Sequence, residues 1–360
     1  MAIKTFENLV NEIIEQSLCS LCGACVAVCS ANEINALFIE KNKPQHVKDS
    51  ELLRKCLDCG ICYLICGQTS DLNDKLEKLY SAIPPLGFYK FLTCARTTNP
   101  EIMAKAQNGG VVTSILKYLL GKNLIDGAIV NKPLENWKSS PYTVTSLEEL
   151  IHSAGTRYST VPVVKELGNY KILNKPNPRL AFVGCPCQVK AIRKMQLLNA
   201  KPGIYIKYII GLFCMENFDY KKLFGEKIKN ELKIDLNNIK KLNIKGNLFI
   251  TLKNNEKIEI SLKDLSTIVR DNCHYCTYFL NMYADISVGG VGSPPGFSTV
   301  LVRTETGNNI FSKLLIENEI KELDKEKLNL TDILSKITKL GQTKYERGIQ
   351  KRTELSGNDK

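Results

Sequence analysis

The chain has 360 residues, of which 44% are hydrophobic and 24% are charged, a globular composition that excludes disorder as the default and allows two or three small domains. Lys and Arg number 49 against 37 Asp and Glu, and the net charge of +12 favours anionic ligands, acidic partners, membrane surfaces or nucleic acid. No apolar stretch reaches the ~18 residues of a membrane helix, and the N-terminal residues lack the apolar segment of a signal peptide. We expect a cytosolic protein that reaches a membrane, if at all, through partner subunits.

Fourteen cysteines require an explanation, because cysteines without an export signal more often bind metals or carry out redox chemistry than form disulfides. Eight of them lie within residues 1–80 as two copies of the spacing C-x2-C-x2-C-x3-C. This spacing is typical of bacterial ferredoxins with two 4Fe-4S clusters, in which the fourth cysteine of each copy binds the other cluster. We predict one cluster on Cys19, Cys22, Cys25 and Cys66, and a second on Cys56, Cys59, Cys62 and Cys29. The alternative is a pair of zinc sites, although zinc motifs usually use two well-separated C-x2-C pairs.

The sequence pattern predicts a ferredoxin-like domain followed by a larger α/β region. The first domain, residues 1–80, opens with an amphipathic helix, and the pair Pro84-Pro85 marks a linker over 81–87 because proline cannot continue a helix. Apolar strands then alternate with amphipathic helices, which is typical of a mixed α/β fold. Strands are expected at 124–130, 179–183, 204–213 and 297–303, and helices at 111–120 and 188–198.

The C-terminal half of the chain has a different composition. Residues 221–263 carry eleven lysines against five acids, with a hairpin expected around Gly246. Aromatic residues are sparse there, so a solvated face is favoured over a nucleic-acid patch. We assign residues 88–215 to the first part of the α/β domain and 216–310 to its second part, and we expect a helical tail over 311–360 that begins after Thr331.

The other six cysteines could supply a third cluster. They are Cys94, Cys185, Cys187, Cys214, Cys273 and Cys276. Cys185, Cys187 and Cys214 each follow a predicted buried strand, where α/β folds place functional loops. Buried free thiols are the alternative, because this is a common fate of cysteine.

Three glycine-bearing segments are candidates for binding an anionic or planar ligand. The first precedes a helix whose N-terminus could hold a phosphate, the second adds a cation and hydroxyls, and the third is a glycine-rich loop that could lie against a ring or a pyrophosphate. A flexible surface turn is the alternative for the third segment. The candidate residues are Asn108, Gly109, Gly110, Val111, Thr113 and Ser114; Gly155, Thr156, Arg157, Tyr158 and Ser159; and Gly289, Gly290, Val291, Gly292, Ser293, Pro294 and Gly296.

Five sequence blocks resemble a known family. They are AQNGGVVTS (106–114), FVGCPCQVKAIRK (182–194), IGLFCMENFDY (210–220), CHYC (273–276) and ADISVGGVGSPPGFSTVLVRT (284–304). Across residues 88–307 the chain is similar to the beta subunits of coenzyme F420-reducing hydrogenase and F420-dependent formate dehydrogenase. With two N-terminal clusters and this length, it resembles most the electron-input subunit of the reduced-F420 dehydrogenase complex of methanogens and related archaea.

The resemblance implies a flavin-binding α/β domain, bound FAD, a deazaflavin substrate and a third 4Fe-4S cluster. Family members often have threonine where Cys185 stands, which makes Cys187, Cys214, Cys273 and Cys276 the expected ligands. The three glycine-bearing segments become candidates for the flavin and deazaflavin pocket. Lysine richness suits the anionic phosphate and oligoglutamate tail of the substrate.

The implied activity is oxidation of reduced coenzyme F420, with hydride passing to FAD and single electrons passing through the clusters to a partner complex or ferredoxin. No acid or base side chain is needed, so no catalytic residue is predicted. The alternatives within the family are coupling to hydrogenase, formate dehydrogenase, sulfite reductase or soluble ferredoxin. Alternatives of other classes are an electron carrier without its own substrate, and a basic metal-containing nucleic-acid binder.

Overall fold

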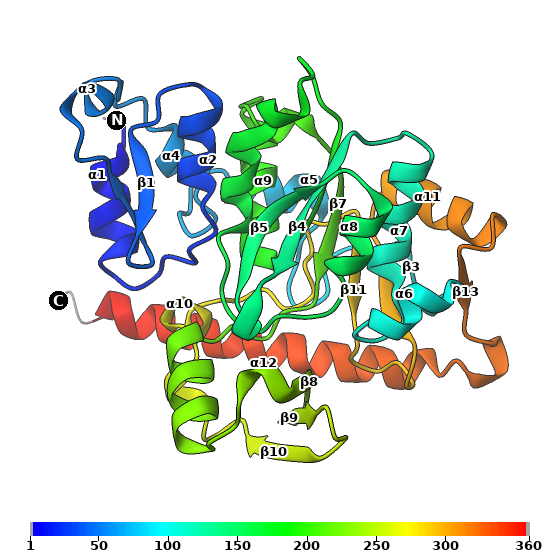
Figure 1. Cartoon of the computed structure of the whole chain (residues 1–360). Helices are drawn as coiled ribbons and strands as arrows, with labels where there is room; N and C mark the ends of the chain where they lie inside the picture. Colours follow the sequence, from blue (N-terminus) through cyan, green and yellow to red (C-terminus); the bar gives the residue numbers. More distant parts are fainter. Residues whose placement is uncertain (1–2, 358–360) are drawn as a thin grey trace.

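A mixed eight-stranded sheet forms the centre of the molecule in the computed structural model, which describes residues 3–357 (Figure 1). Residues 1–2 of the expected first domain and 358–360 of the expected tail lie outside the described residues. The strand order is β13-β3-β12-β11-β7-β6-β4-β5, with β11, β7, β6 and β4 parallel and the flanking pairs antiparallel. The strands are β3 (Phe91–Thr97), β4 (Gly127–Pro133), β5 (Ser139–Val144), β6 (Leu180–Gly184), β7 (Ile206–Leu212), β11 (Ile286–Gly289), β12 (Ser298–Val302) and β13 (Ile320–Glu322). The expected mixed α/β fold is confirmed.

Helices cover this sheet. They are α6 (Pro100–Lys105), α7 (Val111–Gly121), η2 (Glu135–Trp137), α8 (Leu147–His152), η3 (Val163–Leu173), α9 (Pro186–Leu197), η4 (Gly203–Tyr205), α11 (Glu305–Ile316), η8 (Lys325–Lys327) and α12 (Leu330–Gly357). The predicted helices at 111–120 and 188–198 are therefore present. The strand expected at 124–130 begins only at Gly127, because the amides of Leu124 and Ile125 still donate to the Leu119 carbonyl at the end of α7.

The parallel strands β6, β7 and β11 bring three functional loops to one edge of the sheet. Gly184 pairs with Gly211, and Leu212 pairs with Val288, so the carboxyl ends of these strands are level. Cys185 therefore starts one loop, the segment with Cys214 follows the second strand, and the glycine-rich loop after Gly289 follows the third. This is the edge at which open α/β sheets place their ligands.

The sheet draws strands from both sides of the boundary expected near residue 215, because β11, β12 and β13 complete it. Between β7 and β11 lies an inserted unit with its own apolar core and a three-stranded sheet of order β10-β9-β8. Its hairpin turns at Gly246, as expected. The inserted elements are η5 (Lys221–Glu231), η6 (Leu236–Asn238), β8 (Ile239–Lys245), β9 (Asn247–Leu252), β10 (Lys257–Ser261), η7 (Ser266–Ile268) and α10 (Asp271–His274).

The N-terminal segment packs directly on the larger domain instead of standing apart on a linker. Its elements are α1 (Phe6–Leu9), η1 (Val10–Ile14), α2 (Ala24–Ala31), β1 (Leu37–Glu40), β2 (Lys43–His46), α3 (Ser50–Leu53), α4 (Ile61–Leu64) and α5 (Asn73–Tyr80). Ala27 shares one apolar core with Leu167 of η3 and Phe182 of β6. Gly168 favours this contact, since a Cβ there would lie 3.1 Å from the Cβ of Ser30 in α2, which is tighter than ordinary van der Waals contact.

The expected C-terminal tail contains one helix of 28 residues, α12, which passes below the central sheet toward the N-terminal segment (Figure 1). It begins at Leu330, slightly before the expected start. The side chain of Asn329, not Thr331, accepts the hydrogen bond from the amide of Asp332. Over the part of the chain that the structure describes, no helix is both long and apolar enough to cross a membrane.

Candidate functional site

Cys19, Cys22, Cys25 and Cys66, the first cysteine group, lie together at the junction of the N-terminal segment and the larger domain. Burial raises the pKa of each thiol, and for Cys19, Cys22 and Cys25 the neighbouring thiols of the group add to the rise, bringing the pKa of Cys22 to about 12. The Lys194 ammonium of α9 donates to the Cys66 carbonyl and fixes the end of this loop. Four thiols in one buried place are the donor set of an iron–sulfur cluster.

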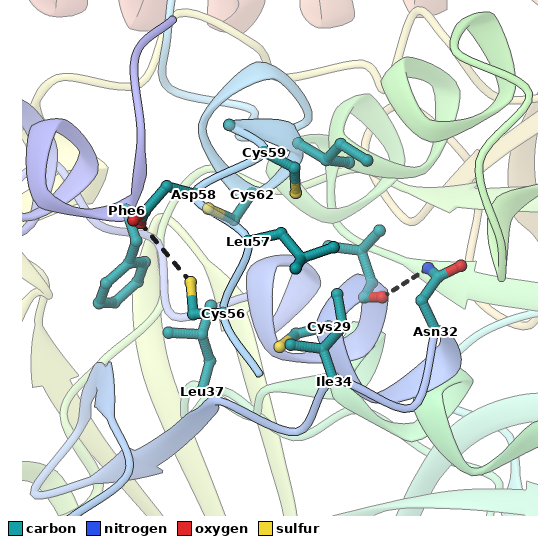
Figure 2. Close-up of a pocket in the computed structure, with 13 residues that line it drawn as sticks. Phe6, Cys29, Asn32, Ile34, Leu37, Cys56, Leu57, Asp58, Cys59 and Cys62 are labelled. Atoms are coloured by element: carbon teal, nitrogen blue, oxygen red, sulfur yellow. Dashed lines mark hydrogen bonds between the residues drawn. The ribbon is translucent and has the colours of Figure 1, made fainter. Parts of the chain in front are cut away.

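Cys29, Cys56, Cys59 and Cys62, the second cysteine group, line one cavity of the N-terminal segment (Figure 2). Apolar side chains including Phe6 and Leu37 form other parts of its wall. The amide of Ala36 donates to the Cys29 sulfur at 3.2 Å, and such N–H···S bonds stabilise a thiolate. The two groups are neighbours, because the Cys62 thiol is among those that raise the pKa of Cys25. Among residues 3–357, no three His, Cys, Asp or Glu side chains meet at a point suited to a single metal ion.

The thiols of the third cysteine group, Cys187, Cys214, Cys273 and Cys276, all act on the charge of Lys344, whose ammonium donates to the Cys214 carbonyl. Burial lowers the pKa of Lys344, but the four thiols outweigh burial and raise it above its usual value. The Cys187 thiol, whose pKa burial raises, also faces Cys22 of the first group. The structure thus brings together the four cysteines that the sequence analysis selected.

Two further residues adjoin the third group. The Cys185 thiol hydrogen-bonds the Cys214 sulfur, which lowers the pKa of Cys214 and raises that of Cys185. The Asn217 side chain donates to both sulfurs, at 3.8 and 3.5 Å, and its main-chain amide donates to Cys273 at 3.4 Å. Cys94 lies elsewhere, fully buried in β3, where its thiol bonds to Thr299.

The first and third glycine-bearing segments meet at the carboxyl edge of the sheet. The space that a Cβ on Gly290 would fill is taken by the Asn108 amide, 2.4 Å away. Gly109 fits between β3 and β12, and its amide donates to the Ser298 hydroxyl. Within the same segment, the Ser114 hydroxyl is fully buried and donates to Thr97, so it braces α7 against the sheet.

The second segment, Gly155–Ser159, lies beside the inserted unit. Gly155 approaches the Lys105 carbonyl, and the largely buried Arg157 guanidinium stacks over the Trp137 ring. The Ser159 backbone pairs with Phe218, which follows Cys214 in the chain. Lys241 of β8 donates to the Gln107 carbonyl, so the inserted unit contacts the first segment as well.

Two buried polar atoms beside these segments have no hydrogen-bond partner within residues 3–357. They are Arg96 Nε, whose guanidinium stacks over Phe297 directly after Gly296, and Thr160 Oγ1, directly after Ser159. An orphaned cation next to a glycine-rich loop fits an anionic group such as the pyrophosphate of a dinucleotide. The donor set therefore suits FAD as well as iron–sulfur clusters.

Sequence reasoning missed Asn217, Arg96 and Lys344. Asn217 lies within a block that carried the family resemblance, so its position was marked although its role was not. Arg96 belongs to a strand that the pattern did not predict. Lys344 gave no signal, because one lysine among many on an amphipathic helix looks like a solvated residue.

Two family models match this chain. The model for the N-terminal part of the coenzyme F420 hydrogenase/dehydrogenase beta subunit matches residues 92–167, and the model for its C-terminal part matches residues 178–327. The chain belongs to this family.

Relatives and one solved structure agree with the family. A subunit of the F420H2 dehydrogenase of Methanosarcina mazei is 31% identical, and the match covers 93% of each chain. Coenzyme F420-dependent sulfite reductase of Methanocaldococcus jannaschii is 31% identical over 97% of this chain and 53% of that protein. In the solved F420-reducing NiFe hydrogenase complex from Methanosarcina barkeri, one chain superposes with a TM-score of 0.71 at 32% identity, covering 76% of this chain and 94% of that one.

Gly109→Ala is expected to destabilise this family member through its glycine segment. A Cβ would lie 2.4 Å from the Ala95 carbonyl oxygen and 2.7 Å from the Ser298 nitrogen, both of them backbone atoms of the sheet. Overpacking of this kind costs about 1–3 kcal/mol. Gly121→Ala is the matched control, because nothing lies within 4 Å of its Cβ and alanine favours the helix α7. Urea midpoints measure the result, and equal midpoints for the two variants would contradict it.

Proposed function

We propose that this chain is an iron–sulfur flavoprotein that oxidises reduced coenzyme F420 and delivers single electrons to a partner. The observation that carries the proposal is the position of the third cysteine group. Gly67, directly after Cys66 of the first group, packs against the Cys187 carbonyl, and Cys214 follows β7, beside the strand that leads into the glycine-rich loop after Gly289. A cluster there would stand between a flavin and the N-terminal clusters.

Bound FAD would supply the conversion of a two-electron donor into single electrons, which the clusters accept one at a time. The residues of this chain would bind these cofactors and orient them. Arg96, the backbone amides of Asn108 and Gly110, and those of the Gly290–Ser293 segment would hold the anionic parts of the flavin. The three cysteine groups would hold three 4Fe-4S clusters. No side chain is assigned a proton to move, because the reacting atoms belong to the two cofactors.

The electron exit is assigned to the second cysteine group. Cys59 is exposed, and Leu57 beside it is 74% exposed, so this group approaches the surface. The match to the F420H2 dehydrogenase subunit covers 93% of the chain and so includes most of the N-terminal segment. It supports a role as the electron-input subunit of such a complex. A hydrogenase or sulfite reductase partner is the alternative, which co-purification of the partner would identify.

An anaerobic donor assay tests the proposal. The protein is reconstituted with iron, sulfide and FAD, and reduced F420 is added with a viologen acceptor, while NADH and NADPH serve as parallel donors. We expect oxidised F420 absorbance to return, with no turnover from either nicotinamide. Turnover with a nicotinamide alone, or full-rate F420 oxidation without FAD, would contradict the proposal. Loaded clusters and FAD without F420 turnover would identify an electron carrier instead.

A further inference from the structure

Helix α12 lies outside both regions that the family models match, since these end at residue 327. It nevertheless contacts two of the three segments that carry the third cysteine group, the one with Cys214 and the one with Cys273 and Cys276. The Lys344 ammonium donates to the Cys214 carbonyl, and Arg347 donates to the Cys273 carbonyl at 3.4 Å. Gly348 lies so close to Cys276 that a Cβ would be 2.8 Å from its carbonyl oxygen. The helix is therefore built into the surroundings of this group.

The same helix continues to the N-terminal segment. Arg352 donates to the Tyr275 carbonyl and, at 3.0 Å, to the Gln68 side chain, two residues after Cys66. Leu355 packs against the apolar core that surrounds the second cysteine group. Contacts at the third cysteine group and at the N-terminal segment therefore fix the position of α12.

Lys344 brings a positive charge that no carboxylate neutralises. It is 1% exposed, and it takes part in none of the salt bridges found within residues 3–357. The nearby carboxylate of Glu216 is occupied by Arg347, with an Nη1 to Oε2 distance of 3.2 Å. The Nε atom of Arg347 is itself buried and unpartnered. The side of α12 that adjoins the third cysteine group is therefore cationic.

We propose that Lys344 is a positioning and tuning residue, whose charge raises the reduction potential of the third cluster. The inference rests on the proposed function, because it needs a cluster on the third cysteine group. Reduction adds one negative charge to a cluster, and a fixed positive charge beside it in a medium of low dielectric favours the reduced form. Helix α12 holds that charge in place from outside the family's common domain.

The test is a redox titration of the reconstituted full chain followed by electron paramagnetic resonance. Lys344→Gln keeps a donor for the Cys214 carbonyl but removes the charge, Lys344→Met removes both, and Lys344→Arg keeps the charge. Lys339→Met is the matched control on the exposed face of the same helix. We expect the Gln and Met variants to lower the ratio of reduced to oxidised third cluster at a fixed potential on the order of tenfold, which is 59 mV for one electron. The Arg and Lys339 variants should match the wild type.

The outcomes separate the inference from the function on which it rests. Unchanged third-cluster midpoints in Lys344→Gln, or equal shifts of all three clusters, would overturn the inference and leave the proposed function intact. A wild-type protein with fully loaded N-terminal clusters and no third signal would overturn both. If the Lys344→Met protein does not assemble the third cluster, the midpoint potential of that cluster in the Lys344→Gln protein tests the inference.

Discussion

On the proposed function, Cys187→Ser is expected to disconnect the flavin from the N-terminal clusters. Cys187 belongs to the third group and is the second residue of α9, and Gly67 of the first group's loop packs against its carbonyl. Loss of this thiol should remove the third cluster while leaving the first two loaded. The rate at which reduced F420 reduces the N-terminal clusters should fall by more than the roughly 10–100-fold that loss of a ligand's hydrogen-bond partner costs. Rapid-mixing absorbance and iron content measure both effects.

The controls for this prediction are two other cysteines. Cys94→Ala alters a buried thiol remote from the three groups and should retain all clusters and the transfer rate. Cys185→Ser retains a small polar side chain beside Cys214 and should keep the third cluster. A Cys187→Ser protein that still reduces its N-terminal clusters at the wild-type rate would refute the electron path.

Arg303→Leu should produce the largest loss of stability. The guanidinium is 3% exposed and donates to the carbonyls of Leu86, Phe88 and Leu280 and to the Ser287 hydroxyl. Burial lowers its pKa to about 9, so it stays charged at neutral pH. Leucine would leave these buried acceptors without donors, at about 1–3 kcal/mol for each strongly affected group. We expect a total of about 4 kcal/mol or more and a marked fall in the urea midpoint.

Two comparison variants test whether the lost hydrogen bonds of Arg303 cause the loss of stability. Arg54→Leu removes an exposed arginine and should change stability by no more than about 0.5 kcal/mol. Arg303→Lys keeps the charge but offers a compact ammonium in place of the planar fork, so its loss should be intermediate. A midpoint for Arg303→Leu equal to that of Arg54→Leu would show that the four hydrogen bonds contribute little.

The local hydrophobic pattern predicted helices and strands with strong periodicity, and it missed strands whose position depends on pairing with distant strands. Helices α7 and α9 and strands β6 and β7 are long apolar or amphipathic runs, so they could be placed. Strand β3 is polar at several positions, and it is held by partners more than 200 residues away in the chain, which sequence periodicity does not reveal. For the same reason the pattern suggested a boundary near residue 215 that the sheet crosses.

For the candidate site, spacing was informative only where ligands are close in sequence. Eight cysteines within 48 residues predicted their own grouping, and the structure brings the same two sets of four together. The third group joins residues that are up to 89 positions apart, and it was selected only through the family resemblance. Lys344 and Arg96 depend on tertiary packing alone, so no local signal marked them.

The apolar core that the N-terminal segment shares with the larger domain determines how the rates of electron transfer should respond to solvent viscosity. Ala27, Leu167 and Phe182 are parts of one close-packed interior, so the separations among the three cysteine groups are set by side-chain packing and not by linker length. A carrier domain that swings between docking positions would be slowed by a viscous solvent. Here the internal rates should stay constant as glycerol is added, while the hand-over at Cys59 to a separate acceptor slows, because only that step requires diffusion.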